Sequence, residues 1–287
     1  MPGALPECKL SGELMTEEAY LKQFENEPGH VVATLVFKQY LSYYLGNYQL
    51  AAELSDKTQG YAEKYVSGDS PAMRYLFFDC MTAFTMLRRK GHLLGNRKWR
   101  RRKSKCMQKF ATWRKKGNSN IHHMFLILEA EEYSLRKKVD LQLGRSKFDA
   151  AIAAAGRAGF MQDSALAIER AGAFCAANND SHWASVYLTR AHGRWAEYGA
   201  LAICDQLANR YPEYITEGTM RASTRSVELA MRRVDRSSRK SAIFKDTSES
   251  WQMIKKTTVQ GSVTNPQAVD ADLQLTDLRL CSETTDE

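Results

Sequence analysis

The chain has 287 residues, of which 44% are hydrophobic and 10% aromatic, and its formal net charge is +8. This is enough apolar material for one large core or two ordinary ones, which excludes a wholly disordered chain. The six cysteines show no Cys-x-x-Cys spacing, which argues against a zinc site and a disulfide framework. No segment reaches the roughly eighteen apolar residues of a membrane span, and residues 1–11 lack the features of a signal peptide. We therefore expect a cytoplasmic chain with no transmembrane segment.

Apolar residues recur at steps of three and four almost everywhere up to Tyr211, which is the spacing of amphipathic helices rather than strands. One such stripe contains Val32, Leu35, Val36 and Tyr40, and the breaks between stripes are rich in Gly, Asn, Ser and Pro. The predicted helices are 16–26, 30–45, 48–66, 71–90, 97–116, 120–138, 144–157, 162–177, 181–198 and 200–210. The predicted fold class is all-α.

The middle third of the chain matches itself after a shift of forty residues. Residues 125–129 fall on residues 165–169, and the set Gly144, Phe148, Ala151 falls on the set Ala184, Leu188, Ala191. A fixed period of this size predicts stacked helical hairpins, because one hairpin cannot bury its own apolar face. Such a stack is a solenoid, whose broad surface is suited to binding other molecules.

The helices group into four hairpins, and three segments of the chain follow from them. The hairpins are 30–66, 71–116, 120–158 and 162–198. The segments are an N-terminal leader with a short helix (1–29), the helical repeats (30–212) and a C-terminal tail (213–287). The last 71 residues hold 18 Ser or Thr residues and only two aromatic ones, so we expect the tail to be disordered.

Positive charge is concentrated between Arg88 and Lys116, where fourteen Lys or Arg residues occur without an acidic one. The basic cluster is its densest part: Arg97, Lys98, Arg100, Arg101, Arg102, Lys103 and Lys105. Such a block needs an anionic counterpart, which could be nucleic acid, anionic lipid, an import receptor, an acidic partner protein or this chain itself. In the last case the neutralising residues lie on the next helix, on a face predicted to be solvated. They are Glu129, Glu131, Glu132 and Asp140.

The other candidate sites are aromatic or histidine-containing. Tyr40, Tyr43 and Tyr44 form a candidate groove between the first hairpins, with core packing as the alternative. His122 and His123 are adjacent and therefore point about 100° apart on a helix, whereas joint metal binding needs a spacing of four. We predict no catalytic residue, no metal ligand and no cofactor.

Several short segments between Gln108 and Tyr214 form a familiar series. They are Lys-Phe-Ala-Thr-Trp (109–113), Asn-Ile-His-His (120–123), Leu-Ile-Leu-Glu-Ala-Glu (126–131), Phe-Asp-Ala-Ala-Ile (148–152), Ala-Leu-Ala-Ile-Glu (165–169), Tyr-Gly-Ala (198–200) and Arg-Tyr-Pro (210–212). The series resembles the tetratricopeptide-like region behind the AAA-type ATPase module of large multi-domain signalling kinases, including multi-sensor histidine kinases and related serine/threonine kinases. It departs from the family at Phe148, where Tyr is usual, and at Tyr198, where Trp is usual.

The resemblance implies a tetratricopeptide-like solenoid in a signalling context. The ATPase and kinase chemistry does not transfer, because the sequence contains neither a Gly-x-x-x-x-Gly-Lys-Ser/Thr loop nor His-Arg-Asp and Asp-Phe-Gly motifs. We therefore expect a non-enzymatic protein-interaction and regulatory module, derived from or part of an ATPase-coupled sensor kinase. Its partners would be a protein segment or ATPase, kinase or sensor modules. The alternative is an electrostatic adaptor, cytoplasmic or nuclear, that binds nucleic acid or anionic membrane through the basic cluster.

Overall fold

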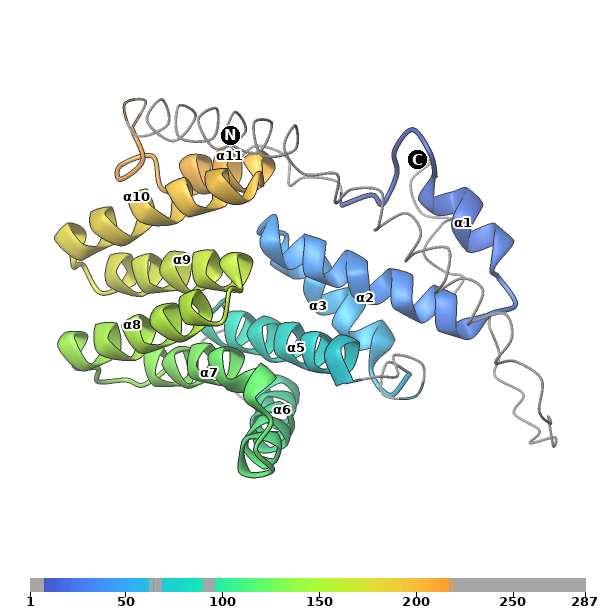
Figure 1. Ribbon diagram of the computed structural model, residues 1–287, viewed down its shortest axis with the longest axis horizontal. Coiled ribbons are helices and arrows are strands. Elements are labelled where there is room, and N and C mark those ends of the chain that lie inside the picture. The colour runs from blue at the N-terminus through green and yellow to red at the C-terminus, as the bar shows by residue number, and fades with distance from the viewer. Residues whose placement is uncertain (1–7, 62–63, 65–68, 90–95, 217, 219–287) are drawn as a thin grey trace, which may run out of the picture. The chain divides into compact units, whose positions relative to one another are not determined.

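A computed structural model describes residues 8–61, 64, 69–89, 96–216 and 218 (Figure 1). The chain divides into two compact units, residues 1–227 and 228–287, and every described residue belongs to the first. All regular elements in the described part of the chain are α-helices or 3-10 turns, so the predicted all-α class is confirmed. The tail predicted from residue 213 lies, beyond Gly218, outside the described residues.

The helices follow one another with short connections. They are α1 (Glu17–Gln23), α2 (Pro28–Tyr44), α3 (Tyr48–Thr58), α5 (Asp69–Arg89), α6 (Arg97–Lys115), the 3-10 turn η2 (Ser119–Ile121), α7 (His122–Ser134), α8 (Leu141–Arg157), α9 (Met161–Ala177), α10 (Ser181–Tyr198) and α11 (Leu201–Arg210). Four predicted ends were wrong by three residues or more. The helices predicted to end at residues 26, 66 and 138 end at Gln23, Thr58 and Ser134, and the one predicted to begin at residue 144 begins at Leu141.

Consecutive helices pack in pairs. Helix α2 packs against α3, α5 against α6, α7 against α8 and α9 against α10, and these pairs are the four hairpins that the sequence predicts. In addition, α5 contacts both α2 and α7, and α7 contacts α9. Helices α2, α5, α7 and α9 therefore form a row, with their hairpin partners beside it.

Side-chain caps explain several helix starts. Asp140 accepts a hydrogen bond from Leu143 N at 3.1 Å, so α8 begins earlier than Gly144 alone would suggest. Asp180 caps α10 in the same way through Trp183 N at 3.3 Å, and Gly199 ends that helix with φ 86°. The turns at Asp180 and Gly199 lie between helices that the sequence predicts.

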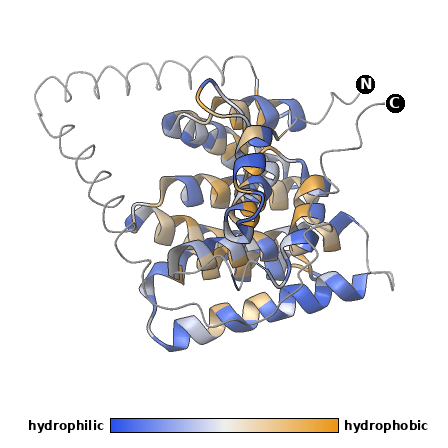
Figure 2. Cartoon of the chain, turned by 90° about the vertical axis from the view of Figure 1, so that its right-hand side faces the viewer, coloured by the Kyte–Doolittle hydropathy of each residue, from blue (hydrophilic) through white to orange (hydrophobic). Residues whose placement is uncertain are grey.

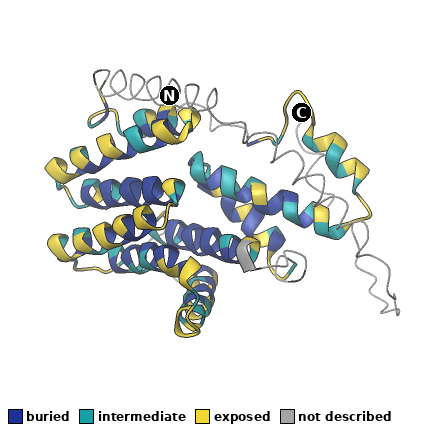
Figure 3. Cartoon of the chain, in the orientation of Figure 1, coloured by how far each residue is buried: buried dark blue, intermediate teal, exposed yellow. Residues whose placement is uncertain are grey.

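The core runs through all the hairpins. Figure 3 shows that α5 and α9 are buried along most of their length, whereas α8 and α10 carry many exposed residues. Figure 2 shows that the helices carry both hydrophilic and hydrophobic residues, as expected of helices that are partly buried. Close packing depends on small residues: a Cβ added at Gly172 of α9 would lie 2.7 Å from Leu188 Cγ of α10.

Candidate functional site

Helix α6, which carries the basic cluster, has one buried face. The buried residues are Trp99, Arg102, Cys106 and Phe110, spaced by three or four positions. The exposed residues of the basic cluster are Arg97, Lys98, Arg100, Arg101 and Lys105. The helical period therefore divides the cluster between the interior and the surface.

Arg102 is a correction to the sequence-based site, because its side chain lies inside the protein and not on the anion-facing surface. It is 5% exposed, and its Nη1 donates to Ser55 Oγ at 2.6 Å and to Asp56 Oδ1 at 3.0 Å. Its Nε lies 3.7 Å from Asp79 Oδ2. Burial raises the pKa of Asp79, and Arg102 opposes that rise. Arg102 thus ties α6 to α3 and α5.

Two further members of the basic cluster are neutralised by this chain. Lys103 Nζ lies 2.6 Å from Glu132 Oε1, and Lys98 pairs with Asp56. Lys98 also lies over the Trp99 ring at 4.6 Å. Lys103 is neutralised by the next helix, which was one of the alternatives in the sequence analysis. The acidic residues on preceding helices, Asp56 and Asp79, were not predicted as partners.

The three tyrosines of the candidate groove pack into the core instead. The rings of Tyr40, Tyr43 and Tyr44 all lie against Phe78, with centroid distances of 4.8, 5.6 and 4.9 Å. Tyr43 is 2% exposed, and burial raises its phenol pKa well above the ordinary value. The groove assigned to these residues is therefore wrong for Tyr43, and the alternative of core packing is confirmed.

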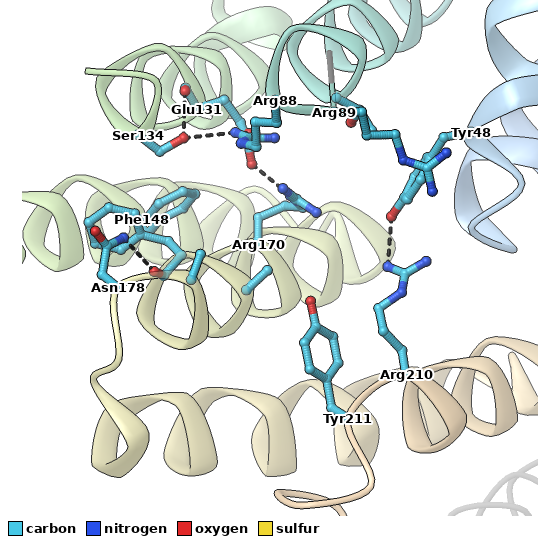
Figure 4. A pocket seen from close by; sticks show the side chains of 14 residues that line it. Tyr48, Arg88, Arg89, Glu131, Ser134, Phe148, Arg170, Asn178, Arg210 and Tyr211 are labelled. Carbon is cyan, nitrogen blue, oxygen red and sulfur yellow. Dashed lines mark hydrogen bonds and ion pairs between the residues drawn. The ribbon is translucent and has the colours of Figure 1, made fainter. Parts of the chain in front are cut away.

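A pocket of about 300 Å³ lies nearby, between the ends of several helices (Figure 4). Four arginines and one carboxylate are among its lining residues. They are Arg88, Arg89, Arg170, Arg210 and Glu131. The aromatic and small residues of its walls are Tyr48, Tyr211, Phe148, Phe174, Ala173 and Ala177. We call this the arginine pocket.

Glu131 of α7 holds two of the arginines. Arg170 Nε of α9 donates to Glu131 Oε1 at 2.7 Å, and Arg88 Nη2 of α5 donates to Glu131 Oε2 and to Ser134 Oγ. Glu131 is 0% exposed, which corrects the prediction that it lies on a solvated face. Burial alone would raise the pKa of Glu131, but the two guanidinium groups outweigh this effect and lower it. Glu131 is therefore an anion at neutral pH.

On the opposite side of the arginine pocket, α11 contacts α3, the hairpin partner of α2. Arg210 Nη1, at the end of α11, donates to Tyr48 Oη of α3 at 2.7 Å and lies 3.8 Å from Glu169 Oε1. Both Arg89 and Arg210 lie over the Tyr48 ring, at 5.1 and 5.0 Å. Figure 4 shows Arg170, Arg210 and Tyr211 pointing toward one common space.

A second buried charge cluster lies between α5, α7 and α9. His123 Nε2 lies 2.8 Å from Asp163 Oδ2, and Arg74 Nη1 donates to Asp163 Oδ1 at 2.5 Å. The His123 ring also stacks on Phe160 at 4.3 Å. His123 is thus an interior residue, while His122 is exposed, so the two histidines diverge as their spacing requires. This cluster ties α5, α7 and α9 to one another.

Arg88, Arg170 and Arg210 were not predicted as a set from the sequence, because their carboxylate partners lie on other helices. Within the described part, no group of His, Cys, Asp and Glu side chains is arranged to hold a metal ion. None of the helices described here combines the length and the hydropathy needed to cross a bilayer. No family model, curated protein or solved structure matches the chain.

Proposed function

We propose that the chain is a non-catalytic, tetratricopeptide-like helical-repeat module that binds an acidic segment of a partner protein at the arginine pocket. The single observation that carries this proposal is the convergence of four arginines on one cavity from helices α5, α9 and α11. Glu131 is the only carboxylate among the described residues that line the same cavity. An excess of guanidinium groups at a concave site favours an anionic ligand.

The row of α2, α5, α7 and α9 supports the repeat interpretation. Each hairpin contributes a helix to the row, and residues from all four hairpins and α11 meet at the pocket. In a helical-repeat protein a surface shared by successive repeats is the usual binding surface. The family resemblance adds the context of an intracellular signalling protein, in which ATPase, kinase or sensor modules are the partners.

The proposal can be tested with a displayed library of random peptides selected on the purified full chain. Selected peptides should be rich in Asp and Glu, and fluorescence anisotropy should show weaker binding to Arg89→Gln than to wild type. Arg89 is exposed and forms no ion pair among the described residues, so its loss should leave the fold intact. The control is Arg101→Gln on the exposed face of α6. Failure to select any peptide, or equal weakening by both variants, would contradict the proposal.

A second candidate function is an electrostatic adaptor, and the exposure of five cluster residues on α6 favours it. Arg97, Arg100 and Arg101 project from the same helix without acidic residues between them. If about five cations contact phosphates of a nucleic acid, the logarithm of the affinity should fall with the logarithm of salt at a slope of roughly −4. Substitution of Arg100 and Arg101 by Glu should abolish this binding, and unchanged polyanion binding would remove the candidate.

A further inference from the structure

We propose that the arginine pocket recognises a phosphate monoester on a side chain of the partner segment. This inference rests on the proposed function and names the chemical group that the pocket takes. It starts from the balance of charge, since four guanidinium groups face one carboxylate that two of them already use. Glu169 adds a second negative charge 3.8 Å from Arg210, which still leaves a surplus of two cations. A dianion matches that surplus, whereas a carboxylate supplies one charge.

Unused donors line the same cavity. Arg88 Nη1 is buried and has no hydrogen-bond partner among the described residues, although the Nη2 of the same guanidinium has two. Arg170 donates to Glu131 through its Nε, the one hydrogen bond of its guanidinium to a side chain in the described part of the chain. A buried donor without a partner destabilises the folded protein, so an acceptor oxygen brought by a ligand would relieve that cost.

The donors surround the cavity instead of lying in one plane. Arg88 and Arg89 come from the end of α5, Arg170 from the middle of α9, and Tyr211 from the residue after α11. Figure 4 shows their side chains approaching the common space from different helices, with the Tyr211 hydroxyl facing Arg170 across it. A planar carboxylate presents two oxygens in one plane, whereas a phosphate monoester presents three acceptor oxygens around a tetrahedral centre.

The rest of the pocket provides room for an apolar body next to the phosphate. Phe148 lies on the side of the pocket away from Arg210 in Figure 4, and Phe174, Ala173 and Ala177 also line the wall. A cavity of about 300 Å³ exceeds what a phosphate group alone would fill. We therefore expect a phosphorylated side chain with its carbon atoms against this wall, and an aromatic ring fits the wall's composition.

The test uses three small probes with the purified full chain in isothermal titration calorimetry: phenyl phosphate, inorganic phosphate and benzoate. Phenyl phosphate should bind at least about 10-fold more tightly than benzoate, because charge-assisted hydrogen bonds are worth about 1.5–3 kcal/mol each. It should also bind more tightly than inorganic phosphate, which lacks the ring. Equal or tighter binding of benzoate, or no binding of phenyl phosphate at millimolar concentration, would overturn the inference.

Two variants locate the site. Arg89→Gln and Tyr211→Phe should each weaken phenyl phosphate binding, by about 10-fold and about 3-fold, through loss of one donor. Their matched controls are Arg101→Gln and Tyr198→Phe, which change exposed residues outside the pocket and should leave binding unchanged. Weakening by the controls to the same extent would show nonspecific attraction by the basic surface and would refute the assignment.

The pH dependence separates phosphate from carboxylate. The second pKa of a phosphate monoester is about 6, so affinity for phenyl phosphate should rise from pH 5 to pH 7.5 as the dianion forms. Benzoate is ionised throughout this range, and no histidine is among the described lining residues. A flat profile for phenyl phosphate would count against recognition of the dianion.

The outcomes for peptides distinguish this inference from the proposed function. A tyrosine-phosphorylated form of a selected peptide should bind more tightly than the unphosphorylated form, and Arg89→Gln should remove the difference. Selected peptides that bind through Arg89 without any gain from phosphorylation would refute the phosphate inference and leave the proposed function standing. Phenyl phosphate binding without any peptide binding would instead remove the proposed function and support a site for a small phosphorylated molecule.

Discussion

Substitution of Glu131 by Gln should destabilise the protein because it leaves two arginines without their shared anion. Breaking one partner of a buried ion pair costs about 3–5 kcal/mol. The Glu131 side chain is fully buried, whereas 28% of the Arg88 side chain is exposed and can regain water. We therefore expect a loss of about 3 kcal/mol, at the lower end of that range. At about 2–4 °C per kcal/mol, the midpoint of thermal unfolding should fall by roughly 6–12 °C.

Circular dichroism at 222 nm during heating and urea unfolding measures both quantities. The matched control is Glu129→Gln on the same helix, since Glu129 is 37% exposed and lies 3.9 Å from Arg114. A surface pair of this kind contributes about 0–1 kcal/mol, so the control should unfold almost like the wild type. A loss below about 1 kcal/mol for Glu131→Gln, or an equal loss for both variants, would refute the assignment of Glu131 as a buried anion.

Acid provides an independent check on Glu131. The pKa of Glu131 is lowered in the folded protein, so its ionised form stabilises the fold above the unfolded-state pKa of about 4.3. This contribution is lost as the pH falls through the lower folded-state pKa. The difference in unfolding free energy between wild type and Glu131→Gln should therefore shrink below about pH 4. A difference that stays constant on acidification would contradict a charged Glu131.

Three other substitutions test the packing. Arg102→Ala should cost about 3 kcal/mol in urea unfolding because it leaves buried carboxyl and hydroxyl groups without their partner, whereas the adjacent exposed Arg101→Ala should change stability by less than about 0.5 kcal/mol. Gly172→Ala should cost about 1–3 kcal/mol through a clash with α10, whereas Gly156→Ala, with open space around its Cβ, should stabilise the helix by about 0.5–1 kcal/mol. Trp195→Ala should cost about 3–5 kcal/mol, since the ring is 1% exposed, and a smaller loss would place it outside the core.

Helix positions could be predicted from the sequence because they depend on local information. Apolar residues at steps of three and four locate the buried stripes, and the break at residues 178–181 coincides with the turn before α10. The wrong ends of α7 and α8 have a local cause as well. Asp140 caps α8 by accepting a hydrogen bond from Leu143 N, and the prediction did not include this cap.

The arginine pocket could not be predicted, because its contacts join residues far apart in the sequence. Arg170 and Glu131 are 39 positions apart, and Tyr48 and Arg210 are 162 apart. The helical period shows which residues of one helix face inward, but it does not show which helix they face. The basic residues of α6 could be recognised as a cluster because they are adjacent in the sequence. The arginines of the pocket are close only in space, so they could not.

The buried charges nevertheless leave a local signal. Glu131 follows the buried Ile127 and Leu128 by four and three positions, and Arg102 follows the buried Trp99 by three. In both helices a charged residue occupies the apolar stripe. Because a charge on that stripe must find a partner of opposite sign in the interior, it predicts an ion pair to a neighbouring helix. The same criterion identifies Arg170, four positions before the buried Phe174.

These interior charges also explain how a binding site can arise from the packing of hairpins. One carboxylate, Glu131, lies between arginines of two neighbouring helices and cannot neutralise both. Such pairs add little stability compared with apolar contacts, but they specify which helix faces which. We infer that the ties between α5, α7 and α9 fix the register of the row. The excess positive charge lies in the arginine pocket, where α9 of the row approaches Arg210. A ligand with two negative charges would neutralise it.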